Sequence, residues 1–189
     1  LDIRRLKRRL TFKGVEEKVL ELERKLYNNL FVPGMHTNIT QQEILGTLQQ
    51  ARQTLIEQHN GLFLYLLDNL ISKVEIFGLH FASLDVRQDS AVHGKVLEVL
   101  AEKSAVLPAA YNTSTDAQKI DILQSLQTPA DVAVLNNDLY KDTLLCMQAV
   151  KTIQAYNGEA GCNRYIISQC ASALNVMEVY GLFLLAGWK

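Results

Sequence analysis

The residue of this sequence best suited to chemistry is Arg87, within the stretch Phe77 to His93. If residues 81–87 form a strand, alternation places every second side chain on one face, which becomes more polar toward its end. The side chains on that face are Phe81, Ser83, Asp85 and Arg87. A guanidinium group keeps its charge, and its planar fork matches a phosphate or a carboxylate in two contacts. The pattern predicts an anion-binding arginine at the carboxyl end of a strand, where α/β folds place their sites.

The residues beside Arg87 have expected supporting roles. We expect Asp85, on the same face, to orient Arg87 or to act in the site itself. Gln88 is expected to contact the substrate or to add hydrogen bonds around the site. Asp89 and Ser90 can cap a helix over residues 91–104, whose N-terminus would also favour an anion. The alternative is a purely structural Arg87, paired with Asp85 or with a helix carboxylate.

The histidines do not predict a metal site within this sequence. His80 and His93 have no Glu or Cys at ligand spacing, and His36 and His59 fall in expected loops or helix ends. We expect packing roles for all four.

The composition indicates a folded chain with no nucleic-acid or membrane partner. Of 189 residues, 48% are hydrophobic and 21% charged, and the formal net charge is −1. Five basic residues within positions 1–10 fit a solvated helix face better than a nucleic-acid arm, because no aromatic residue lies among them. The run Leu62 to Leu67 is too short to span a bilayer.

Three cysteines without a CxxC pair favour a reducing, cytoplasmic location. Cys146 and Cys170 fall in apolar segments and are expected to behave as small hydrophobic residues. The sequence lacks an initiating Met and stops directly after an apolar helix, so we expect a piece cut from a longer polypeptide.

Hydrophobic periodicity predicts a mostly α-helical chain with short parallel strands. Thr40 and Glu43 form the pattern of a capping box, and the helix over 62–77 is apolar on nearly every side, which predicts burial between layers. Leu145 and Ile153 are expected in the buried face of a long helix. The expected strands are 81–87 and 164–168, and the expected helices are 14–30, 41–59, 62–77, 91–104, 116–126, 139–156 and 172–186.

Two motifs in this chain resemble those of the phosphoenolpyruvate carboxylase family. The first is close to the family's FGxHxAxLDIRQES followed by a histidine, and the second to its YIISMAxTPSDVLAVxLLxxEAG. The first is matched by Phe77, Gly78, His80, Ala82, Leu84, Asp85, Arg87, Gln88, Ser90 and His93. The second is matched by Tyr165, Ile166, Ile167, Ser168, Val176, Val179, Leu182, Ala186 and Gly187.

The resemblance implies a helix-rich (α/β)8-type barrel in a cytoplasmic homotetramer of large subunits. It implies an enzyme that joins bicarbonate to phosphoenolpyruvate with Mg2+ or Mn2+, giving oxaloacetate and phosphate. Arg87 matches the family arginine that contacts the substrate near its phosphate. The family's histidine motif belongs upstream and its metal-binding carboxylates downstream, so residues 1–189 are expected to be one inactive fragment of a catalytic domain. Within it, 1–77 form a helical region and 78–189 a barrel segment.

The sequence departs from the family pattern at several places. Asp89 stands where the family usually has Glu, Val92 stands where an arginine is common, and Ala173-Leu174-Asn175 replaces Pro-Ser-Asp. The alternative function is a helical scaffold or adaptor domain in which Arg87 is only structural.

Overall fold

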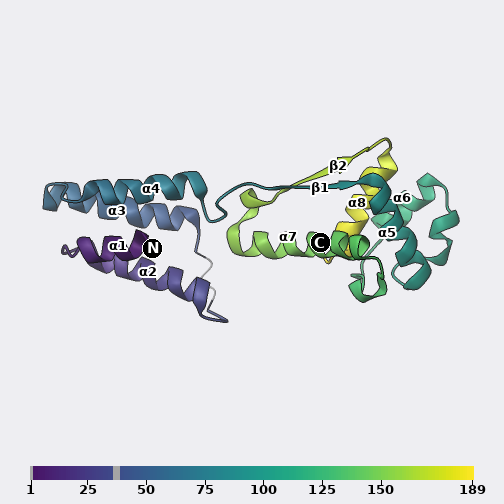
Figure 1. Ribbon diagram of the computed structural model, residues 1–189, viewed down its shortest axis with the longest axis horizontal. Coiled ribbons are helices and arrows are strands. Elements are labelled where there is room, and N and C mark those ends of the chain that lie inside the picture. The colour runs from purple at the N-terminus through teal and green to yellow at the C-terminus, as the bar shows by residue number, and fades with distance from the viewer. Residues whose placement is uncertain (1, 36–38) are drawn as a thin grey trace. The chain divides into compact units, whose positions relative to one another are not determined.

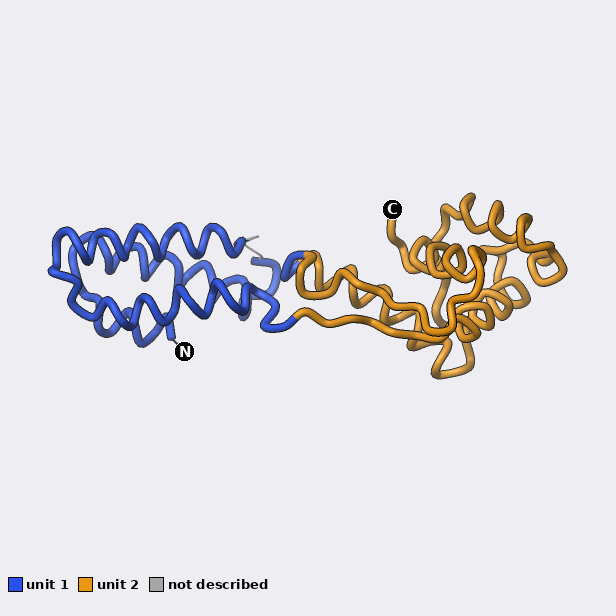
Figure 2. The backbone as a smooth tube through the Cα atoms, turned by 90° about the horizontal axis from the view of Figure 1, so that it is seen from above, with its two compact units in different colours: residues 1–82, 156–158 blue, residues 83–155, 159–189 orange. Residues whose placement is uncertain are grey.

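The computed structural model describes residues 2–35 and 39–189, so His36 lies outside the described residues. The chain divides into two compact units (Figure 2). The first comprises residues 1–82 and 156–158, and the second comprises 83–155 and 159–189.

The first unit is built from α-helices (Figure 1). Their buried apolar side chains form one core cluster. They are α1 (Asp2–Arg9), α2 (Glu16–Phe31), α3 (Gln41–His59) and α4 (Leu64–Phe77). The apolar side chains of α2 recur at spacings of three and four, which turns Val19 and Leu22 inward. The predicted helices of this region are confirmed to within two residues at each end.

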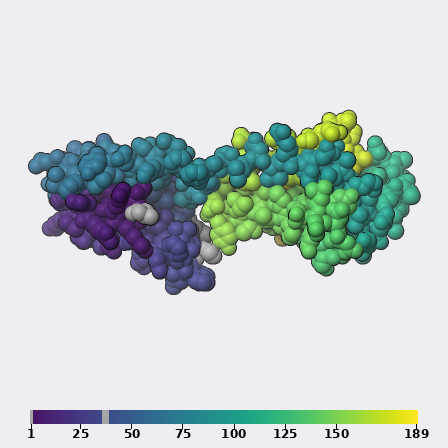
Figure 3. All heavy atoms as spheres, in the orientation of Figure 1, coloured from purple at the N-terminus to yellow at the C-terminus, as the bar shows by residue number. Residues whose placement is uncertain are grey.

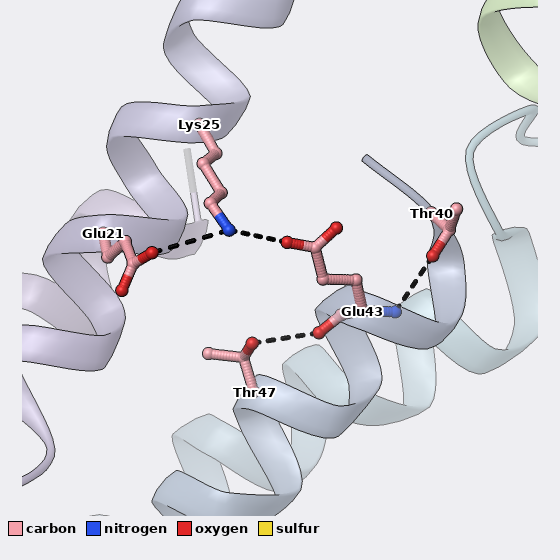
Figure 4. Close-up of polar contacts among 5 residues, drawn as sticks. All are labelled: Glu21, Lys25, Thr40, Glu43 and Thr47. Atoms are coloured by element: carbon pink, nitrogen blue, oxygen red, sulfur yellow. Dashed lines mark hydrogen bonds and ion pairs between the residues drawn. The ribbon is translucent and has the colours of Figure 1, made fainter. Parts of the chain in front are cut away.

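The start of α3 has half of the predicted capping box. The Thr40 side chain accepts a hydrogen bond from the Glu43 backbone N–H at 3.1 Å. The Glu43 carboxylate does not accept from the Thr40 backbone N–H, as a full capping box requires. It accepts instead from Lys25 Nζ at 2.6 Å (Figure 4). Lys25 also contacts Glu21 at 3.5 Å, so this carboxylate joins α3 to α2.

The prediction that α4 is buried between layers is wrong for the chain described here. Its buried side chains are Leu67 and Ile71, whereas Ile76 is 73% exposed. Helices α3 and α1 cover only one side of α4 within this unit. The burial of an apolar helix depends on how many other elements pack against it, and the sequence of the helix does not determine that number.

The second unit combines one parallel strand pair with helices. The strands are β1 (Asp85–Asp89) and β2 (Arg164–Ser168), and residues 85–89 lie beside 164–168 in register. The α-helices are α5 (Ser90–Lys103), α6 (Asp116–Gln124), α7 (Asp138–Asn157) and α8 (Ala173–Leu185). Short 3-10 turns cover Ala109–Thr113, Val132–Val134 and Glu159–Gly161.

Strand β2 has the predicted bounds, whereas β1 begins four residues later and ends two residues later than predicted. Arg87 is therefore the central residue of β1, and the prediction that it ends the strand is wrong. Phe81 has a φ of 62°, in the left-handed region that strands exclude. Its backbone N–H bonds to the Phe77 carbonyl, which continues the turn at the end of α4. Because β2 begins at Arg164, a strand starting at Phe81 would have no partner for its first residues.

The core of the second unit lies between α5, α6, α7 and α8. Leu144 and Met147 of α7 are fully buried, but Leu145 is 40% and Ile153 39% exposed, so the prediction of their burial is wrong. The observed class is mostly helical with two short parallel strands, as predicted. In the part of the chain that the structure describes, no helix has the length and apolar character needed to cross a membrane.

Candidate anion-binding site

Arg87 lies at the centre of β1, and its side chain is exposed. Val86 and Gln88, on the other face of the strand, are half-buried, so the alternation predicted for this segment holds for residues 85–88. Figure 3 shows β1, in teal, open at the surface of its unit. Among residues 2–35 and 39–189, the Arg87 guanidinium has no ion pair and no hydrogen bond. Its charge is therefore available to an anion.

Asp85 shares the exposed face with Arg87 but bonds to a different arginine. Arg164 Nε donates to Asp85 Oδ1 at 2.7 Å, across the first register pair of the strands. The structure thus shows neither the expected orientation of Arg87 by Asp85 nor the alternative ion pair between them. Instead, Arg164 neutralises the Asp85 carboxylate, one of the two that lie two residues from Arg87 in the strand.

Gln88 is not brought together with Arg87, because it lies on the opposite face of β1. Its Nε2 atom donates to Thr143 Oγ1 on α7 at 3.4 Å, and its Oε1 accepts from the Asp89 backbone N–H at 2.9 Å. In this structure Gln88 therefore fastens the strand to the helix beneath it.

The end of β1 passes directly into α5. Asp89, rather than Ser90, caps this helix: its carboxylate accepts from the Ala91 backbone N–H at 2.9 Å. Ser90 Oγ donates to the Gln169 carbonyl at 3.0 Å, just beyond the end of β2. The Asp89 carboxylate therefore offsets the positive end of the α5 dipole, three residues after Arg87.

His93 and Tyr165 are residues whose connection the sequence analysis missed. His93 is 0% exposed, and its Nε2 atom lies 2.8 Å from the Tyr165 hydroxyl. Burial lowers the pKa of His93 to about 4, although the Asp89 carboxylate opposes the change, so this imidazole is neutral at pH 7. Burial also raises the pKa of the Tyr165 hydroxyl. Both residues belong to the two family-like motifs, which is the feature of the sequence that could have drawn attention to them.

Two of the departures from the family pattern have structural roles here. Val92 packs against the core of the second unit. Asn175 accepts from the Ala171 backbone N–H at 3.1 Å and donates to the buried Glu178 carboxylate at 3.2 Å. Burial raises the pKa of Glu178, which its bond from Asn175 partly offsets.

The described residues do not fit a divalent cation. Within 2–35 and 39–189, no three His, Cys, Asp or Glu side chains gather as ligands. The cysteines also differ from expectation: Cys170 is exposed, Cys146 is half-buried and Cys162 is the buried one.

The structure is that of a mostly helical protein whose parallel strand pair carries an exposed arginine, a side chain suited to binding phosphate or carboxylate groups. The family model described as phosphoenolpyruvate carboxylase matches residues 4–189. A phosphoenolpyruvate carboxylase from Synechococcus sp. is 33% identical over 147 residues, 71% of this chain and 14% of that protein. One from Synechocystis sp. is 31% identical over 152 residues, 78% of this chain and 14% of that protein.

The chain belongs to the phosphoenolpyruvate carboxylase family. It spans about 14% of the length of the curated relatives that it matches.

Proposed function

We propose that this chain is a substrate-binding part of a phosphoenolpyruvate carboxylase, the enzyme that forms oxaloacetate and phosphate from phosphoenolpyruvate and bicarbonate. Family membership over residues 4–189 supports this proposal and disfavours the scaffold alternative. The single observation that carries the site is Arg87, exposed on β1 and without a carboxylate partner among the described residues.

Arg87 would act by binding and by charge stabilisation. Its forked N–H groups can donate to two oxygens of a phosphate or carboxylate group, which fixes the orientation of the substrate. When bicarbonate attacks the phosphoryl group, negative charge develops on the oxygens that the guanidinium would contact. The same fixed positive charge would favour the enolate that leaves. Asp85 would contribute by holding Arg164, and Gln88 by holding β1.

We also propose the fold and oligomeric state that the family implies for the complete enzyme. Residues 78–189 would form part of an (α/β)8-type barrel, and residues 1–77 a helical region, in a cytoplasmic homotetramer. The reaction would use Mg2+ or Mn2+, and the family pattern places the metal-binding carboxylates downstream of this chain. The 189 residues alone would then be inactive.

The test is Arg87→Gln in the complete enzyme. Loss of one strong donor to the transition state should lower kcat/KM for phosphoenolpyruvate by roughly 100-fold, with helix content and melting unchanged. Arg164→Gln is the matched comparison, because it removes an arginine of the same sheet that already has a partner, and it should lower kcat/KM by only about threefold. Unchanged kinetics in the Arg87 variant would refute the assignment.

A further inference from the structure

The hydrogen bond between His93 and Tyr165 joins α5 to β2 beneath the strand pair. The two residues are 72 positions apart, and their bonded atoms are 2.8 Å apart. The Tyr165 ring is fixed on two sides. It lies 5.6 Å from the His93 ring and meets Phe183 of α8 edge-on at 5.5 Å. The hydroxyl group therefore points in a defined direction toward His93.

This bond is adjacent to Arg87 in the sheet. Tyr165 is the register partner of Val86, the residue directly before Arg87. On the other side of Arg87, Ser90 bonds to the Gln169 carbonyl beyond the end of β2. Both hydrogen bonds run from α5, which directly follows β1, to β2 or the residue after it, so they hold the C-terminal end of β1 beside β2.

The position of Arg87 depends on how the backbone of β1 is held, because no described side chain bonds to its guanidinium. Its guanidinium has no ion pair or hydrogen bond within the described ranges, so its location follows from the backbone of β1. A shift of about 1 Å at a substrate-binding group can cost a large part of the rate. The buried imidazole is neutral at pH 7, so the bond to Tyr165 persists without a charge in the core.

We propose that His93 and Tyr165 are positioning residues for Arg87: their hydrogen bond holds α5, and with it the end of β1, against β2 so that the guanidinium meets the substrate anion. The inference rests on the proposed role of Arg87. Neither His93 nor Tyr165 touches the substrate in this arrangement. Both lie on the covered side of the strand pair, whereas Arg87 lies on its exposed face.

A double-mutant cycle in the complete enzyme tests this inference. Tyr165→Phe keeps the ring but removes the hydroxyl, and should lower kcat/KM for phosphoenolpyruvate by roughly tenfold, the scale of one buried hydrogen bond. With Arg87→Gln already present, the same change should cost less than about twofold, because the group it positions is gone. Tyr180→Phe, an exposed hydroxyl on α8, is the matched control and should have no effect.

The outcomes separate the two proposals. If Arg87→Gln alone leaves kinetics unchanged, the proposed function fails. The positioning role is refuted if Arg87→Gln lowers kcat/KM strongly but Tyr165→Phe does not change it. It is also refuted if Tyr165→Phe lowers kcat/KM by the same factor with and without Arg87→Gln. Should Tyr165→Phe fail to fold, His93 provides the second test. His93→Gln keeps an amide near the Nε2 position and should retain most activity, whereas His93→Leu should not; equal activity of these two variants would also overturn the inference.

Discussion

Arg164 on β2 bonds to Asp85 on β1 at 2.7 Å, while Arg87, two residues further along β1, has no carboxylate partner in the described chain. The pairing decides which arginine of the sheet is neutralised. Both members of the ion pair are substantially exposed, so the pair adds little to stability. Its consequence is electrostatic, because it neutralises one of the two carboxylates that lie two residues from Arg87 in the strand; the other, Asp89, caps α5.

Arg164→Gln should weaken phosphoenolpyruvate binding modestly. The released Asp85 carboxylate would lie on the face of Arg87, about 7 Å away along the strand, and would lower the positive potential there. We expect KM for phosphoenolpyruvate to rise roughly threefold at low salt, with a smaller effect at high ionic strength. The double variant Asp85→Asn with Arg164→Gln should restore KM. A failure to restore it would show that Arg164 itself contacts the substrate.

Acid should loosen the contact between α5 and β2 through His93. Because burial lowers the folded pKa of His93 from 6.5 to about 4, its neutral form stabilises the fold above pH 6.5. That stability, on the order of 3 kcal/mol, is lost as pH falls from 6.5 toward 4. Amide hydrogen exchange in α5 and β2, corrected for intrinsic rates, should report the loss. In His93→Gln, hydrogen exchange should no longer depend steeply on pH between 6.5 and 4. If the variant keeps the same pH dependence, His93 is not the group responsible.

Gly181→Ala should destabilise the packing of α6 against α8. A Cβ atom at Gly181 would lie 2.5 Å from a terminal methyl of Leu123, which is fully buried and has little room to move. We expect a cost of about 1–3 kcal/mol, seen as faster hydrogen exchange in α6 and α8.

Gly46→Ala is the matched comparison, because nothing lies within 4 Å of a Cβ at that position of α3. Without a clash, the better helix propensity of alanine should slow exchange in α3 by the equivalent of about 0.5–1 kcal/mol. Equal effects of the two substitutions would argue against the tight contact at Gly181.

The cysteines should differ in their reaction with a maleimide. Cys170 is exposed, whereas Cys162 is buried and burial raises the pKa of the half-buried Cys146. Labelling followed by peptide mass analysis should find Cys170 modified first, and Cys170→Ser should abolish the fast phase. A fast phase that survives in this variant would place another thiol at the surface.

Helices and β2 followed from local signals in the sequence. Thr40 caps α3, and the β-branched segment 164–168 is a strand, because capping and alternation involve residues only a few positions apart. The alternation within β1 also predicted that Asp85 and Arg87 share one face and that Val86 lies on the other. The start of β1 was misplaced since it depends on where β2 begins, and the exposed sides of α4 and α7 depend on which neighbours cover them.

By itself, the sequence determined the helical class, the family motifs and the choice of Arg87 as the candidate anion-binding residue. Only the tertiary structure decided that Asp85 bonds to Arg164, 79 positions away, and that His93 meets Tyr165. The physical reason is distance along the chain. Side-chain alternation is a property of one strand, but a hydrogen bond between strands or between helix and strand requires a register that folding alone establishes.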